Sequence, residues 1–314
     1  MTTLSAGLAL WNQRHRVAAR AERARAFAAA VGRRTDLTPY QWAQLLAFAL
    51  EFRPDLIIEL GRERGNSTCC FLEAAELLEP EQPCRLLSLC LTDLWQRETR
   101  PRLEGICSPE WFARGDIRVG DLLAHDFRET LAGCRRCLIF WDAHGFDVAE
   151  CVLGHLLPQL SGRRCAVVMH DMTDLRYDGT PAPAYGPDGL WKGGRDSQGT
   201  FWLGHVCSHV AQAVSVIDFT TRNRIPLRSA AEELHAEFAG RPDREVEAQR
   251  LLGADLFGLS AHWFWFSADD AARPVAYPPW NGRPHRAAPL SRVARTWRRL
   301  GGGLRRALLP AGKE

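Results

Sequence analysis

Four side chains that can transfer a proton or bind a cation stand where two apolar segments of the chain end. Asp142 and His144 follow the first segment, and His170 and Asp171 close the second. If both segments are neighbouring parallel strands, their carboxyl ends open into one crevice, where α/β sheets bind ligands. Two carboxylates favour a hard divalent ion, whereas an imidazole favours general-base removal of a hydroxyl proton. The competing structural interpretation is that the two Asp residues cap the turns that follow them.

The segment 59–68, Glu-Leu-Gly-Arg-Glu-Arg-Gly-Asn-Ser-Thr, has the features of a ligand-binding turn. A strand ends at Glu59, the chain turns through Gly61 and Gly65, and a helix capped by Asn66 or Ser67 follows. Glycine permits positive φ and a close approach of ligand to backbone, and the start of a helix presents N–H groups to an anion. The spacing is neither a dinucleotide nor a Walker motif. We therefore predict a small nucleotide-like cofactor here, against the alternative that the glycines serve the turn alone.

Short apolar runs alternate with amphipathic segments through the middle of the chain. Strands are expected over 55–60, 85–91, 117–119, 137–141, 165–170, 213–219 and 262–266, and helices over 14–31, 38–52, 67–78, 148–160 and 198–212. Thr38 followed by Pro39 is typical of a helix start, and Ser229 is the expected cap of a helix ending near Phe238. This alternation indicates right-handed βαβ units and an open parallel sheet.

The organisation along the chain predicts a helical extension, a main domain and a tail. We expect the extension over 1–53, the domain over 54–280 and a basic tail over 281–314, with a lid loop over 172–200 and a helical insertion over 223–258. From Arg283 onward, eight Arg and one Lys face one Glu, a charge of +8, whereas the remainder has 31 basic and 36 acidic residues, a charge of −5. A tail of this kind is able to make weak contact with an anionic membrane or another polyanion. A solvated, partly disordered extension is the default interpretation, because Gly301-Gly302-Gly303 interrupts the segment.

Cysteine usage and the N-terminus favour a cytoplasmic protein. The chain has ten Cys, and residues 1–11 lack the basic start of a signal peptide. We therefore expect reduced thiols. Cys134 and Cys137 have zinc-like spacing, but no second pair follows, so buried or surface thiols are the preferred interpretation. No apolar run approaches the length of a membrane span.

Three stretches together resemble class I S-adenosylmethionine (SAM)-dependent methyltransferases. They are 57–68, then Leu-Ile-Phe-Trp-Asp-Ala-His at 138–144 with the helix to 160, and Ala-Val-Val-Met-His-Asp at 166–171. The resemblance is greatest to the small-molecule O-methyltransferase-like group, whose first motif is Glu-x-Gly-x-x-x-Gly-x-Ser. It implies a Rossmann-like class I methyltransferase fold, a mostly parallel seven-stranded sheet flanked by helices, with the two late strands as the sixth and seventh.

The same resemblance implies a set of cofactor-binding residues. Glu59, Gly61 and Gly65 would border the methionine portion of SAM, with Ser67 at the helix start, and Asp121 would lie near the adenine.

The second strand departs from the family pattern. Family members usually end this strand with an acidic residue that binds the ribose hydroxyls, and that place falls on Cys90. Asp93, three residues later, is the expected substitute; without it the SAM site would be weak or degenerate.

The resulting prediction is a SAM-dependent methyltransferase that acts on a small-molecule or sugar hydroxyl. His144, His170 and Asp142 are the catalytic candidates, and Asp142 with Asp171 would hold Mg²⁺ or another divalent metal if one is used. A second hypothesis is a non-catalytic methyltransferase-like binding module, which Cys90 favours. A minor one is a metal-dependent hydrolase, because Asp-Ala-His at 142–144 also resembles a fragment of the arginase-type enzymes.

Overall fold

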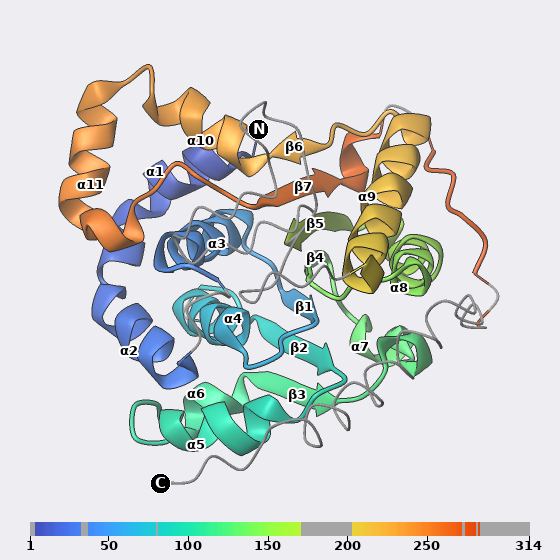
Figure 1. Cartoon of the computed structure of the whole chain (residues 1–314), viewed down its shortest axis with the longest axis horizontal. Helices are drawn as coiled ribbons and strands as arrows, with labels where there is room; N and C mark the ends of the chain where they lie inside the picture. The colour runs from blue at the N-terminus through green and yellow to red at the C-terminus, as the bar shows by residue number, and fades with distance from the viewer. Residues whose placement is uncertain are drawn as a thin grey trace, which may run out of the picture.

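Seven strands form one sheet, in the order β3-β2-β1-β4-β5-β7-β6 (Figure 1). The first five strands are parallel, β7 runs antiparallel to β5, and β6 runs antiparallel to β7. Their bounds are β1 Leu56–Leu60, β2 Arg85–Cys90, β3 Gly115–Val119, β4 Arg136–Trp141, β5 Arg164–His170, β6 Arg228–Ser229 and β7 Trp263–Ser267. The computed structural model describes residues 4–32, 37–79, 81–170, 203–271, 274–280 and 282, without the side chains of 203–211.

The central strands are buried because helices cover both faces of the sheet. All five residues of β1 are buried, as expected of a parallel strand between two helical layers. One face packs against α1 Ala6–Ala18, α2 Ala21–Val31, α3 Pro39–Phe52, α4 Asn66–Leu78, α6 Pro109–Ala113, α10 Ala230–Phe238 and α11 Pro242–Leu256. The other packs against α7 Phe127–Thr130, α8 Phe146–Cys151 and α9 Leu203–Asn223. The predicted fold class, a mostly parallel seven-stranded α/β sheet flanked by helices, is confirmed.

Several shorter elements complete the path. A π-helical turn at Trp95–Thr99 leads into α5 Arg100–Leu103, and a 3-10 turn spans Leu122–Ala124. The helix predicted over 148–160 is α8 continued by a π turn at Val152–Leu156 and a 3-10 turn at Leu157–Leu160. A last 3-10 turn, Ala268–Asp270, follows β7.

The strand predicted over 213–219 is wrong, because these residues belong to α9. The β-branched residues of this segment suggested a strand, but its buried positions, 212, 216, 219, 220 and 223, follow the helical repeat. The sixth strand is instead the two-residue β6 within the predicted insertion, where Ser229 caps α10 as expected.

The helix predicted over 14–31 is also wrong as a single element. α1 ends at Ala18 and α2 begins at Ala21, and α1 starts earlier than expected, at Ala6. The expected start of α3 is confirmed, since Thr38 and Gln41 form a reciprocal capping box with Pro39 in the first turn.

The predicted lid (172–200) and basic tail (281–314, apart from Gly282) lie outside the described residues. Within the described ranges, no helix is long and apolar enough to span a bilayer.

Candidate functional site

The turn from β1 to α4 requires glycine at two positions. Gly61 and Gly65 have φ of +87° and +90°, the left-handed region that favours glycine. A Cβ on Gly61 would lie 2.9 Å from the backbone of Asp142 and Ala143, and a Cβ on Gly65 would lie 2.3 Å from the Trp95 ring. The turn is therefore packed between the end of β4 and the Trp95 indole.

The helix that follows begins without a side-chain cap. Gly65 is the N-cap of α4, so the predicted cap at Asn66 or Ser67 is wrong. Because no described side chain caps the first turn of α4, this helix start has the character of an anion-binding site.

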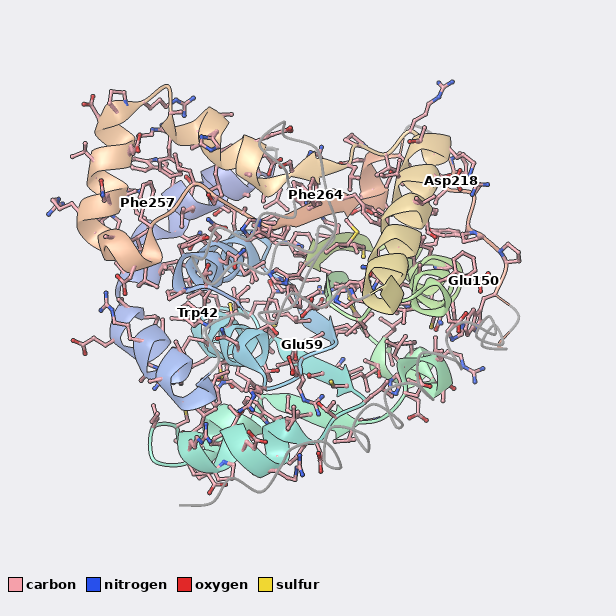
Figure 2. All side chains as sticks on the ribbon, in the orientation of Figure 1. Trp42, Glu59, Glu150, Asp218, Phe257 and Phe264 are labelled. Atoms are coloured by element: carbon pink, nitrogen blue, oxygen red, sulfur yellow. The ribbon has the colours of Figure 1, made fainter. Side chains whose placement is uncertain are left out.

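Glu59 lies at the centre of the molecule, where β1 runs into α4 (Figure 2). Its side chain is fully buried, and Oε2 accepts hydrogen bonds from the hydroxyls of Thr68, at 2.6 Å, and Ser88. Burial raises the pKa of the Glu59 carboxyl, and the hydroxyls of Ser67, Ser88 and Thr68 act in the opposite direction, as does the charge of Arg62. Oε1 has no hydrogen-bond partner among the described residues.

Arg62, inside the turn, ties the ends of two strands together. Its guanidinium is almost completely buried and donates to the backbone carbonyls of Arg118 at 2.8 Å and Ser88 at 3.3 Å. Burial lowers the pKa of this guanidinium, although the charges of Glu59 and Cys90 oppose the change. The turn is thereby fixed to the carboxyl ends of β2 and β3.

Cys90 ends β2 in a polar environment. Burial by itself would raise the pKa of its thiol, but hydrogen bonds from the backbone N–H groups of Thr92, Arg62 and Glu63 and from the Thr92 hydroxyl outweigh burial and lower it. The N–H groups of Arg62 and Glu63 belong to the glycine turn over 61–65, and that of Thr92 belongs to the loop after β2. The thiol therefore lies between these two segments.

The other predicted residues near β2 and β3 are at the surface. The Asp93 side chain is 55% exposed and forms an ion pair of 3.1 Å with Arg97. Asp121 caps the 3-10 turn after β3 by accepting a hydrogen bond from the backbone N–H of Leu123. Beside them, Leu91 and Val119 are apolar but 74% and 50% exposed. Leu91 follows β2 and Val119 ends β3, so each lies near the carboxyl end of its strand.

Asp142, His144 and His170 come together at the carboxyl ends of β4 and β5. Asp142 Oδ1 lies 3.4 Å from His170 Nδ1 and 3.8 Å from His144 Nε2. Because the Asp142 N–H donates to the Leu60 carbonyl at 2.8 Å and only glycine fits beside the Asp142 backbone, this strand-end cluster adjoins the glycine turn over 61–65. Asp171, its fourth predicted member, lies outside the described residues.

Gln212 on α9 belongs to the same cluster and was missed in the sequence. Its side chain is fully buried, and Oε1 lies 3.1 Å from His144 Nδ1. The only sequence signal would have been a polar residue on the buried face of α9, four residues before Val216.

The metal site predicted at Asp142 and Asp171 lies only partly within the described residues, since Asp171 is outside them. No group of three or more His, Cys, Asp or Glu side chains among the described residues is arranged to hold an ion. Cys134 and Cys137 are both buried and form no disulfide.

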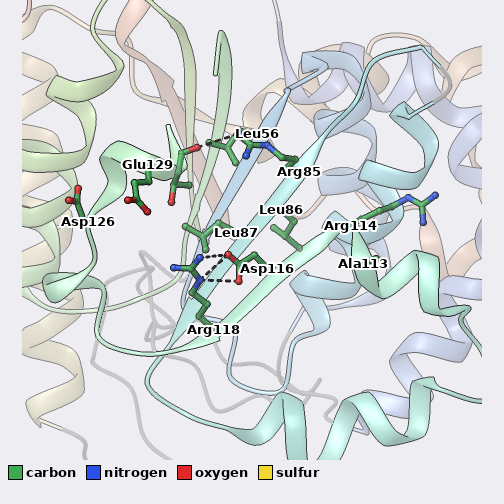
Figure 3. A pocket seen from close by; sticks show the side chains of 11 residues that line it. Leu56, Arg85, Leu86, Leu87, Ala113, Arg114, Asp116, Arg118, Asp126 and Glu129 are labelled. Atoms are coloured by element: carbon green, nitrogen blue, oxygen red, sulfur yellow. Dashed lines mark hydrogen bonds and ion pairs between the residues drawn. The ribbon is translucent and has the colours of Figure 1, made fainter. Parts of the chain in front are cut away.

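A separate cavity of about 280 Å³ lies near the amino ends of β1, β2 and β3 (Figure 3). Leu56, Leu86 and Leu87 form part of its wall, and Arg118 within it is ion-paired to Asp116. None of the predicted site residues lines this cavity, so it is distinct from the strand-end cluster.

Comparison with known proteins gives similarity at the level of structure only. No protein-family model matches the chain, and no curated protein matches its sequence. Among solved structures, it is similar to the methyltransferase PaMTH1 of Podospora anserina bound to S-adenosylhomocysteine (SAH), with 16% identity over 60% of this chain and 71% of that one, at a TM-score of 0.42. It is also similar to an O-methyltransferase of Bacillus cereus in complex with SAH, with 15% identity over 67% and 82% of the two chains, at a TM-score of 0.42. A third is the O-methyltransferase TomG of Streptomyces achromogenes in complex with SAM, with 18% identity over 60% and 70%, at a TM-score of 0.37.

Proposed function

We propose that this chain is a SAM-dependent methyltransferase that modifies a hydroxyl of a small molecule or sugar. The supporting observation is the close approach of the glycine turn to the end of β4, where the Asp142 N–H donates to the Leu60 carbonyl at 2.8 Å and a Cβ on Gly61 would collide with the Asp142 backbone. A cofactor bound on the turn would lie beside the strand-end cluster. SAM, when bound, supplies an electrophilic methyl group, and the protein must align the acceptor and remove its proton.

The residues of the turn fit the methionine portion of SAM. The buried Glu59 Oε1, which has no partner among the described residues, would accept from its ammonium group. The uncapped start of α4 would bind its carboxylate, because helix N-termini favour anions. Gly61 leaves room for the backbone to approach the ligand.

The adenosine portion would lie across the ends of β2 and β3. The exposed Leu91 or Val119 side chain would offer an apolar contact to the adenine, and Asp121 follows β3 nearby in the chain. We propose Asp93 for the ribose, since a carboxylate accepts two hydroxyl hydrogen bonds well. Its exposed ion pair with Arg97 is of a kind worth less than about 1 kcal/mol, so Asp93 can exchange partners.

Proton removal is assigned to the histidines of the cluster. Either His144 or His170 would accept the hydroxyl proton, and the Asp142 carboxylate beside both would stabilise the imidazolium that forms. Among the described residues, Asp142 is the only predicted carboxylate of the strand-end cluster. A divalent metal in the cluster would therefore also need Asp171. No step of the reaction is assigned to a metal.

Calorimetry with SAM and with SAH, each with and without magnesium, tests this proposal. We expect binding of both ligands without metal. If Asp171 is a ligand, magnesium raises turnover, and Asp171→Asn abolishes this gain while leaving the affinity for SAM within about threefold. Absence of binding, together with absence of turnover on a panel of hydroxylated acceptors, would refute the proposal.

The second candidate function is a non-catalytic methyltransferase-like binding module. Cys90 at the position usually occupied by the ribose-binding acid favours it. Binding of SAH without turnover on any acceptor would support this module over the enzyme.

A further inference from the structure

Gln212 contacts the strand-end cluster from a helix outside the β1–α4 unit, which contains the glycine turn. It lies on α9, which packs against α8 and follows the fifth strand. Its amide is fully buried, and Oε1 faces His144 Nδ1 at 3.1 Å. Burying a polar amide at this position has a cost unless it makes a hydrogen bond, so the contact with His144 has a physical reason to persist.

With the Gln212 amide oxygen as its neighbour, this contact favours one tautomer of neutral His144. A neutral imidazole has one N–H group, and an amide oxygen can only accept. The nitrogen that faces Oε1 must therefore be the protonated one, which leaves the lone pair on the other nitrogen. That other nitrogen, Nε2, lies on the side of Asp142, 3.8 Å from Oδ1.

We propose that Gln212 is a positioning residue that holds His144 as the Nδ1–H tautomer and directs its basic Nε2 into the strand-end cluster. This inference rests on the proposed function and names the base. The acceptor hydroxyl gives its proton to Nε2, and the resulting imidazolium is stabilised by Asp142 on one side and by the Gln212 amide oxygen on the other. Gln212 itself touches neither cofactor nor acceptor in this scheme.

The tautomer can be observed without any turnover. Long-range ¹H–¹⁵N spectra of the full chain labelled with ¹⁵N-histidine, recorded near pH 8 where neutral imidazole predominates, separate the two tautomers, and a His144→Gln sample identifies the signals. We expect the Nδ1–H pattern for His144 in the wild type. An Nε2–H pattern there would mean that the amide is rotated, and it would overturn the proposal.

Two variants of Gln212 and one control complete the test. Gln212→Leu replaces the amide with an apolar group and removes the acceptor, so we expect a shift toward the Nε2–H pattern, a decrease in kcat of tenfold or more and a KM for SAM within about twofold. Gln212→Glu keeps the acceptor and should retain the Nδ1–H pattern. Thr220→Val, which removes another buried hydrogen bond of the same helix, should change neither the spectrum nor kcat.

The outcomes separate this inference from the proposed function. An unchanged His144 pattern in Gln212→Leu, or a loss of kcat equal to that of Thr220→Val, would overturn the positioning role. The expected spectra combined with no turnover on any acceptor would retain the positioning of His144 and remove the methyltransferase assignment.

Discussion

Replacing Glu59 with Gln should change the pH dependence of the protein's stability and lower its affinity for SAM, and the two effects can be measured separately. The carboxyl is fully buried, and burial raises its pKa above the ordinary value of 4.5 despite the neighbouring hydroxyls. A carboxyl with a raised folded-state pKa binds more protons in the folded than in the unfolded state. The free energy of unfolding of the wild type therefore falls as the pH rises above about 4.5, until the folded-state pKa is passed.

The change in the free energy of unfolding depends on the single proton that Glu59 binds and on its Oε1 atom, which has no partner among the described residues. Glu59 contributes at most about 1.4 kcal/mol per pH unit, and the uncharged Gln contributes none. The amide NH₂ of Gln would occupy the position of Oε1, which lacks a partner among the described residues, at a pH-independent cost of about 1–3 kcal/mol. The stability of Glu59→Gln relative to the wild type should thus be lowest near pH 4 and rise with pH.

Urea unfolding at several pH values, followed by calorimetry with SAM, measures both properties. We expect the affinity for SAM to fall about 10- to 100-fold, because a charge-assisted hydrogen bond to the ammonium group is worth about 1.5–3 kcal/mol. Glu104→Gln, at an exposed carboxylate paired with Arg100, should alter neither the pH slope nor the affinity. Parallel stability curves for wild type and Glu59→Gln would refute the raised pKa, and unchanged affinity would refute the role in binding.

Three further predictions concern the base, the ribose and the tail. His144→Ala should lower kcat about 10²- to 10⁴-fold and remove the gain in rate with rising pH that a titrating base produces; a pH–rate profile unchanged in this variant and in His170→Ala would place the chemistry elsewhere. Asp93→Ala should weaken SAM binding measured by calorimetry, whereas Cys90→Ser should not, and the reverse pattern would assign the ribose to the thiol. Truncation after Gly282, which keeps the tilted contact of Trp280 with His155 (ring centroids 5.9 Å apart), should preserve the melting temperature and SAM affinity but reduce binding to anionic vesicles more than tenfold; unfolding would show that the tail belongs to the core.

The local features that the sequence predicted well are those with strong local rules. The apolar run before Glu59 could only be a buried strand, and Thr38-Pro39 specified the start of α3 through the capping box. The convergence of Asp142, His144 and His170 was also predictable, because parallel strands place their carboxyl ends at one edge of the sheet.

The failures occurred where distant contacts override local pattern. Val214, Val216 and Ile217 have strand propensity, yet α9 buries only the helical face that contains Val216 and leaves Val214 and Ile217 exposed. β6 has only two residues, too few for a periodic signal. The approach of Gln212 to His144 joins residues 68 positions apart, and no local rule reports such a contact.

The packing of the glycine turn over 61–65 also determines which substitutions this segment would tolerate. A substitution library over 61–65 should return only glycine at both ends, since any Cβ at Gly61 meets backbone and any Cβ at Gly65 meets Trp95. Between them, Glu63 has φ of +44°, which costs an ordinary residue conformational energy. Position 63 should therefore be enriched in glycine and asparagine under selection for thermostability. The turn thus leaves an engineer little freedom in backbone shape, and a redesigned ligand preference would have to come from the strand ends that face it.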